Sequence, residues 1–94
     1  MTNIQIKDSL TISNILKCAQ MLQENLTVEP EELNVNLQKV EDCDTSGVQL
    51  IISLQKSAIR SNKKISFDDV PDAVTAAFQS VGIDDMANYL TTEL

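Results

Sequence analysis

The sequence predicts a single small α/β domain, with a mainly parallel four-stranded sheet and helices packed on one of its faces. Short segments that alternate polar and apolar residues, as half-buried strands do, are interleaved with longer segments whose apolar residues recur every three or four positions. Strands that alternate with helices favour a parallel sheet. Right-handed crossovers then place successive helices on the same face. The chain has 94 residues, which suits one domain over residues 1–94.

The first strands are predicted close to the N-terminus. Residues 3–6 and residues 9–12 both alternate polar and apolar side chains, with Lys7 and Asp8 between them. This pattern predicts either a pair of strands or one bent strand.

A change of spacing at Ser13 predicts the first helix. Apolar residues now recur every three or four positions, with Leu16 alongside, at Ile15, Ala19, Leu22 and Leu26. Residues 27–31 are a polar connector in which Pro30 forbids further helix.

The middle of the chain holds the clearest strand and the longest helix. Apolar residues alternate with amide side chains at Leu33, Val35 and Leu37. A loop over residues 40–44 leads into a second helix, from Thr45 to about Asn62, with a broad apolar stripe. Residues 65–67 are predicted to form the next strand.

The last third of the chain is predicted to be helical. Pro71 suits the first position of a third helix, and Gly82 suits its left-handed C-terminal cap, with Ile83 closing over the end. A short final helix is expected from Asp84 and Asp85 through Leu90.

The amino-acid composition argues against several classes of function. The net charge is −7 and there is no histidine, so phosphate backbones and anionic membrane surfaces are disfavoured partners. Without histidine, without a Gly-rich phosphate loop and without metal-ligand spacing, we expect no enzyme, no cofactor and no metal. We expect reduced thiols that help to fill the core at Cys18 and Cys43. No window reaches the ~18 apolar residues of a membrane span, which favours a cytoplasmic protein.

One polar segment stands out, Asp44-Thr45-Ser46-Gly47, where a loop enters the long helix. Helix capping explains Asp44 and one hydroxyl. It does not explain two hydroxyls followed by Gly47, which costs up to ~1 kcal/mol inside a helix. A hydroxyl at a helix N-terminus lies where free N–H groups can hold an added phosphate. A glycine beside it would let the backbone of another protein come close.

This segment resembles a family signature. The residues Asp44-Thr45-Ser46-Gly47-Val48-Gln49-Leu50 resemble the D-[ST]-x-G-[VL]-x-x-L motif of STAS domains, found in bacterial anti-sigma-factor antagonists and in sulfate-transporter tails. The strands at residues 33–37 and 62–67, and the helix that begins at Pro71 and ends near Gly82, resemble the same family. The similarity covers roughly residues 3–90.

The resemblance implies a protein-docking function. The hydroxyl directly after the aspartate is the phosphoacceptor in regulated members, which here is Thr45, with Asp44 orienting it. The contact surface for a serine/threonine kinase of the anti-sigma type would include Ser46, Gly47, Val48 and Leu50. Some features depart from the pattern: no Gly lies between the first strands, and Val70 precedes Pro71 where a capping Ser is usual.

One alternative stays open, and two others do not fit the sequence. The sequence of the motif is also similar to that of STAS proteins encoded with chemotaxis-type kinases and of the STAS subunit of lipid ABC transporters. This similarity implies a constitutive adaptor. Asp8-Ser9-Leu10 is similar to the D-S-L of acyl carrier proteins, which are all-helical. A receiver domain phosphorylated on Asp44 would need an acidic pair after the first strand, where Asp8 stands alone.

Overall fold

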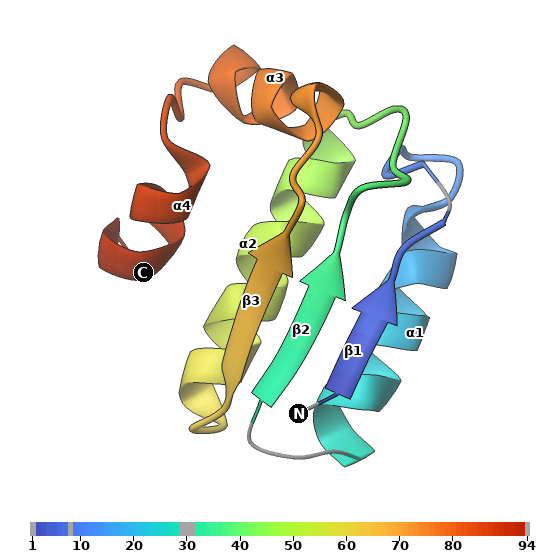
Figure 1. Cartoon of the computed structure of the whole chain (residues 1–94), viewed down its shortest axis with the longest axis vertical. Coiled ribbons are helices and arrows are strands. Elements are labelled where there is room, and N and C mark those ends of the chain that lie inside the picture. Colours follow the sequence, from blue (N-terminus) through green and yellow to red (C-terminus); the bar gives the residue numbers. More distant parts are fainter. Residues whose placement is uncertain (1, 8, 29–31, 94) are drawn as a thin grey trace.

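The computed structural model describes residues 2–7, 9–28 and 32–93, and it places three parallel strands in chain order (Figure 1). They are β1 (Thr2–Gln5), β2 (Glu32–Asn36) and β3 (Lys64–Asp68), with β2 in the centre. Asp8 and most of the predicted connector, including Pro30, lie outside the described residues. The parallel sheet was predicted correctly.

The fourth strand, predicted over residues 9–12, is wrong for the described part of the chain. Leu10 forms only an isolated parallel bridge with Cys43. Its N–H donates to the carbonyl of Asp42 (2.8 Å), and its carbonyl accepts from the N–H of Asp44 (3.0 Å). A turn starts directly afterwards, with the N–H of Asn14 donating to the carbonyl of Thr11 at 2.9 Å. Because the chain turns so soon, a single residue pairs where the alternating pattern predicted four.

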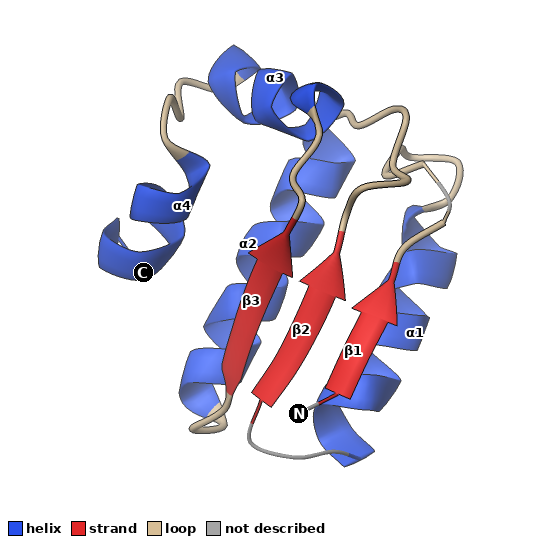
Figure 2. Ribbon diagram, viewed as in Figure 1, coloured by secondary structure: helices blue, strands red, loops and turns tan. Residues whose placement is uncertain are grey.

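Helices α1 (Ile15–Val28) and α2 (Thr45–Arg60) cover one face of the sheet, as expected (Figure 2). Helix α3 (Asp72–Ser80) crosses near the carboxyl ends of the strands. The chain ends in a short helix α4 (Met86–Asn88) that continues into a π-helical segment η1 (Tyr89–Glu93). The side chain of Gln55 ties this segment to α2, since its Nε2 donates to the carbonyl of Leu90 at 3.2 Å.

The two faces of the sheet differ sharply in chemistry. On the helix side, Leu33 and Val35 are buried in the core, 4% and 0% exposed. On the other side, amide side chains bond across neighbouring strands. Asn34 Nδ2 donates to Asn3 Oδ1 and Gln5 Nε2 donates to Asn36 Oδ1, both at 3.2 Å. This strict alternation explains why helices cover only one face.

A single aliphatic core joins the sheet to the helices. Its fully buried members include Phe78 of α3, Leu22 and Cys18 of α1, and Leu54 of α2. Cys18 and Cys43 are both free thiols. The free thiols fit the prediction of reduced cysteines, and both side chains pack in or against this core.

The helices begin and end close to the residues predicted from the sequence. Gly82 has φ +88°, and the N–H of Ile83 donates to the carbonyl of Phe78 at 2.9 Å, which closes α3 as predicted. Pro71 is the residue before α3 rather than its first residue. Helix α2 ends at Arg60, slightly earlier than predicted, because Asn62 takes a left-handed conformation with φ 57°.

Candidate functional site

The segment singled out from the sequence lies at the carboxyl end of the sheet. After β2 the chain runs through a loop to Asp44, and α2 begins at Thr45. The bridge between Leu10 and Cys43 holds the loop after β1 beside this loop. Two loops distant in sequence therefore meet at the N-terminus of α2.

The carboxylate of Asp44 organises this corner. Its Oδ1 accepts hydrogen bonds from the N–H groups of Ser46 (2.8 Å) and Gly47 (3.4 Å), which caps α2. Its Oδ2 accepts from the N–H of Ile12 at 3.0 Å. One side chain thus fixes both the start of the helix and the loop that follows Leu10.

These donors also act on the charge of Asp44. The hydrogen bond from the Ile12 N–H is the main cause that lowers the pKa of this carboxyl, and the bonds from Ser46 and Gly47 add to it. Desolvation opposes the shift but does not cancel it. Asp44 is therefore a fixed negative charge at neutral pH.

The two hydroxyls of the motif are placed differently. The Ser46 hydroxyl is half-buried and hydrogen-bonds to the Asp44 carboxylate. Thr45 is exposed. Within residues 2–7, 9–28 and 32–93, no hydrogen bond engages the Thr45 hydroxyl. Two of the N–H groups at this helix end, those of Ser46 and Gly47, already donate to the Asp44 carboxylate. That free N–H groups hold a phosphate on Thr45 stays a prediction.

The packing inside the protein requires a glycine at position 47, which the sequence alone did not reveal. It is buried, and a Cβ at this position would lie 2.6 Å from the carbonyl oxygen of Leu10 and 2.7 Å from Sγ of Cys43. The backbone that approaches this glycine is therefore the protein's own. Gly47 leaves space for the loop after β1 rather than for another protein.

Two further residues predicted to contact a partner are part of the core. Val48 is 2% exposed and Leu50 is 7% exposed. Leu50 lies on the buried stripe of α2, so the predicted contact of its side chain with a partner does not fit its burial. Of the predicted contact residues, the surface retains Asp44, Thr45 and part of Ser46.

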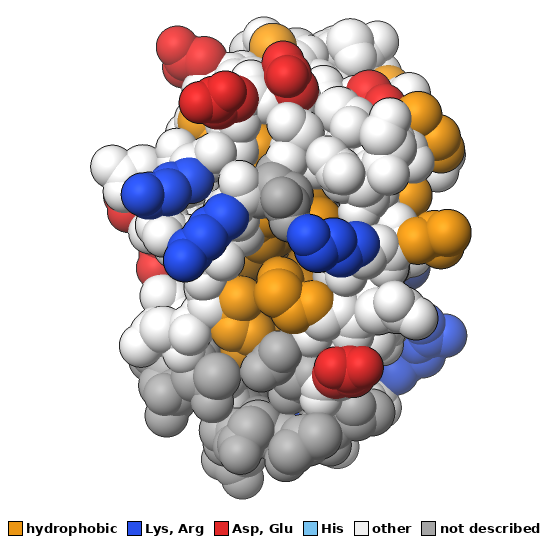
Figure 3. All heavy atoms as spheres, turned by 90° about the vertical axis from the view of Figure 1, so that its right-hand side faces the viewer, with side chains coloured by type: hydrophobic (Ala, Val, Ile, Leu, Met, Phe, Trp, Pro, Cys, Tyr) orange, Lys and Arg blue, Asp and Glu red, His pale blue; other side chains and the backbone are white. Residues whose placement is uncertain are grey.

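Two apolar residues beside this corner were not predicted as site residues. Ile12 is 72% exposed and Leu16 is 79% exposed, and the backbone of Ile12 is bonded to Asp44. Figure 3 views the molecule from the β1 and α1 side and shows hydrophobic side chains at the surface there. The spacing of apolar residues in α1 could have indicated the exposure of Leu16, because Leu16 lies beside the buried stripe of the helix rather than on it. We call Ile12, Leu16, Asp44, Thr45 and Ser46 the Thr45 surface.

Cys43 lies underneath this surface without the features of a nucleophile. Burial, and to a lesser degree the neighbouring charge of Asp44, raises the pKa of its thiol to about 11. The thiol is thus protonated at neutral pH and weakly reactive.

Other kinds of site find no support in the part of the chain that the structure describes. No group of three or more acidic, cysteine or histidine side chains there could hold a metal ion. None of the described helices is long and apolar enough to cross a membrane.

The family model described as "Mlab, STAS domain" matches residues 2–92, nearly the whole chain. No curated protein matches the chain.

Proposed function

The chain belongs to the STAS domain family, whose members are generally regulatory domains that bind other proteins, and on that premise we propose that its Thr45 surface docks a protein partner. The partner is a serine/threonine kinase of the anti-sigma type. Phosphorylation of Thr45 ends the interaction. The domain performs no catalysis of its own in this proposal.

The observation that carries the proposal is the contrast among three consecutive side chains. Asp44 and Ser46 are engaged with each other and with the backbone, whereas Thr45 is exposed at the first position of α2. A kinase can therefore reach this hydroxyl without local unfolding. The exposed Ile12, whose backbone is bonded to Asp44, supplies apolar contact area at this corner, and the exposed Leu16 extends it along the first turn of α1.

The fixed charge of Asp44 supplies the switch. A phosphate on Thr45 adds nearly two negative charges directly beside a carboxylate that stays ionised because of its hydrogen bonds. The N–H groups of Ser46 and Gly47, which could otherwise neutralise part of a phosphate's charge, already donate to Asp44. The added charge thus remains exposed and repels a partner surface that fits a neutral hydroxyl.

One observation favours a second candidate, a constitutive adaptor subunit of a chemotaxis signalling complex or a lipid ABC transporter. Because the N–H groups of Ser46 and Gly47 already donate to Asp44, they are not available to stabilise a phosphate on Thr45. In an adaptor, Thr45 would contact the partner permanently through its hydroxyl and methyl groups.

Partner capture from a lysate of the source cells separates the two candidates. The baits are the wild-type chain, Thr45→Ala, Thr45→Asp and Ser53→Asp. The last adds the same charge at another exposed position of α2. Mass spectrometry identifies the captured proteins and any phosphate on Thr45 or Ser46. The phosphoswitch predicts a kinase that binds wild type and Ser53→Asp and is lost with Thr45→Asp.

The opposite outcomes are equally clear. A non-kinase partner retained by all four baits, with no phosphate on Thr45, would replace the switch with the constitutive adaptor. Loss of a partner with Ile12→Ser or Leu16→Ser, but not with Val81→Ser, assigns the apolar part of the surface. Val81 is the matched control because it is also an exposed hydrophobic residue, at 43%.

A further inference from the structure

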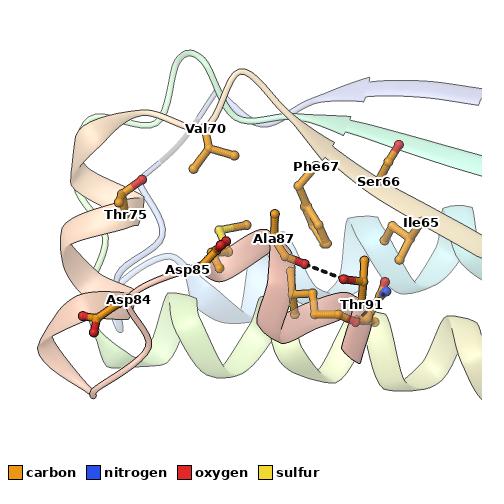
Figure 4. Close-up of a pocket in the computed structure, with 12 residues that line it drawn as sticks. Ile65, Ser66, Phe67, Val70, Thr75, Asp84, Asp85, Ala87 and Thr91 are labelled. Carbon is orange, nitrogen blue, oxygen red and sulfur yellow. Dashed lines mark hydrogen bonds between the residues drawn. The ribbon is translucent and has the colours of Figure 1, made fainter. Parts of the chain in front are cut away.

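A groove runs along the side of β3 that faces away from β2. Two cavities of about 440 and 370 Å³ share Gln55, Ile65, Ser66 and Thr91 in their linings, and the smaller one also reaches Glu32 and Leu33 at the start of β2. Helix α4 and segment η1 form the opposite wall through Met86, Ala87 and Leu90. Figure 4 shows Phe67 and Ala87 reaching into this space from opposite sides. We call this cleft the β3 groove.

The backbone of β3 presents free hydrogen-bonding groups to the groove. The N–H of Leu37 donates to the carbonyl of Asp68 at 2.9 Å, so the backbone groups of Asp68 face β2. Successive residues of a strand point their N–H and C=O groups to opposite edges. The N–H and C=O groups of Ile65 and Phe67 therefore face the groove. No strand among the described residues pairs with them, since the sheet order ends at β3.

A buried side-chain oxygen of Gln55 also lies beside the groove. Gln55 Oε1 is buried and has no hydrogen-bond partner in the described structure, while Nε2 of the same amide is engaged by Leu90. Buried side-chain oxygens are almost always paired in native proteins. Since Gln55 lines both cavities, a donor inside the groove would satisfy this oxygen.

The other residues that line the groove indicate what chemistry a ligand should have. The middle of the groove is apolar, with Ile65, Phe67 and Met86 available to surround a large side chain. The charges differ between the two cavities: Asp84 and Asp85 line the larger one, whereas Lys63, Lys64 and Glu32 line the smaller one. The basic end of a ligand therefore fits beside Asp84, and the net charge of −7 favours it. A ligand with regularly spaced backbone donors and acceptors, an apolar side chain and a basic end has matching chemistry.

We propose that the β3 groove binds an extended, basic peptide segment of a partner protein as an added strand. The segment pairs with the backbone of Ile65 and Phe67. It inserts one large apolar side chain between Phe67 and Met86, donates a hydrogen bond to Gln55 Oε1, and places Lys or Arg beside Asp84. This surface does not include Thr45, so the inference is independent of the phosphoswitch.

The test uses peptides displayed on phage as random heptamers and selected against the full-length chain. Enriched sequences are synthesised and titrated while amide hydrogen exchange is followed by NMR. We expect fast exchange at Ile65 and Phe67 in the free protein and clear protection once the peptide binds. The amides of Ser66 and Asp68 face β2 and should be protected throughout.

Methylation of the peptide amides gives the most specific readout. Methyl groups on the amides that face β3 should weaken binding about tenfold or more, and methyl groups on the intervening amides should not, since only alternate amides of an added strand form hydrogen bonds. A matched pair of variants completes the design. Ala87→Phe fills the groove and should abolish binding, whereas Ala76→Phe adds the same ring at an exposed position of α3 outside the groove.

Several results would overturn the proposal. They are failure to enrich any peptide over an Ala87→Phe control selection, binding without protection of Ile65 and Phe67, and methylation effects with no alternation. Dimerisation of the free chain that Ala87→Phe abolishes would overturn it too, because the occupant would then be a second copy.

Discussion

The backbone N–H of Ile12 donates a 3.0 Å hydrogen bond to Oδ2 of Asp44, a residue 32 positions further along the chain. The other oxygen of that carboxylate caps α2 through Ser46 and Gly47. One side chain thus determines how the loop after β1 lies against the N-terminus of α2. Since Thr45 and Ile12 are both held by this arrangement, the shape of the Thr45 surface depends on a single carboxylate.

Asp44→Asn should separate the two tasks of this residue. An amide retains one oxygen for capping α2, but its NH₂ group would face the N–H of Ile12, donor against donor. We expect Tm to fall by about 5 °C, a typical loss for one cap or charged hydrogen bond in a domain of this size. Thermal unfolding followed by circular dichroism measures it.

The matched control for this variant is Asp85→Asn. Asp85 caps α4 through one contact, from the N–H of Asn88 to Oδ1 at 3.1 Å, which an asparagine oxygen can replace. Its Tm should change by less than about 2 °C. Equal losses at both positions would show that the bond to Ile12 adds nothing special.

The stability that Asp44 provides should depend on pH in a defined direction. Its pKa is lower in the folded chain than the ordinary value of 3.8, because the folded state donates hydrogen bonds to the charged form. The contribution is therefore fully present above pH ~4 and disappears as the pH falls through the folded-state pKa. The Tm difference between wild type and Asp44→Asn should stay constant from pH about 8 to about 6 and narrow below about 4. A difference that grew on acidification would have the wrong sign.

Gly47→Ala should destabilise the fold because the added Cβ meets the carbonyl oxygen of Leu10 and Sγ of Cys43. We expect a loss of about 1–3 kcal/mol in the free energy of unfolding, measured with urea. Adding Cys43→Ala removes only the sulfur contact, so it should restore part of the loss. Thr45→Ala, on the exposed side of the same turn, should cost less than about 0.5 kcal/mol. A neutral Gly47→Ala would mean that Leu10 and α2 are further apart.

Cys43 should resist alkylation in the folded protein. With a pKa raised from 9.0 to about 11, its thiolate population at pH ~7.5 is about 100-fold smaller than that of an unperturbed thiol. Iodoacetamide labelling followed by peptide mass spectrometry should show slow reaction in buffer and fast reaction in urea. Labelling of native Cys43 at the rate of the unfolded chain would contradict the burial of its sulfur.

The sequence was informative wherever local spacing decides structure. The alternation at Leu33 and Val35 predicted a strand buried on one face, and Gly82 predicted the end of α3. Both signals depend only on side-chain period or on φ at one residue. The family resemblance agreed with them, and the matching family model covers the same residues.

The sequence was less informative where contacts are long-range. Gly47 suggested an approach by another protein, whereas the backbone that approaches it belongs to Leu10, 37 residues earlier. Leu50 suggested a surface contact, but the position of α2 on the sheet buries it. The pattern at residues 9–12 suggested a strand, and a turn after Leu10 leaves a single bridge. The approach of Leu10 to Gly47 and the burial of Leu50 depend on residues distant in the chain, so local patterns could not predict them.

The unpaired edge of β3 also matters for the solubility of the chain at high concentration. Open strand edges are templates for aggregation unless charges or bends interrupt them. Here Lys64 and Asp68 flank the short apolar stretch, and Asp69 bends the chain away with φ 50°. The net charge of −7 adds repulsion between copies. These residues oppose pairing of the β3 edge with another copy of the chain. We expect replacement of Lys64 and Asp68 by valine to make β3 a starting point for fibril formation.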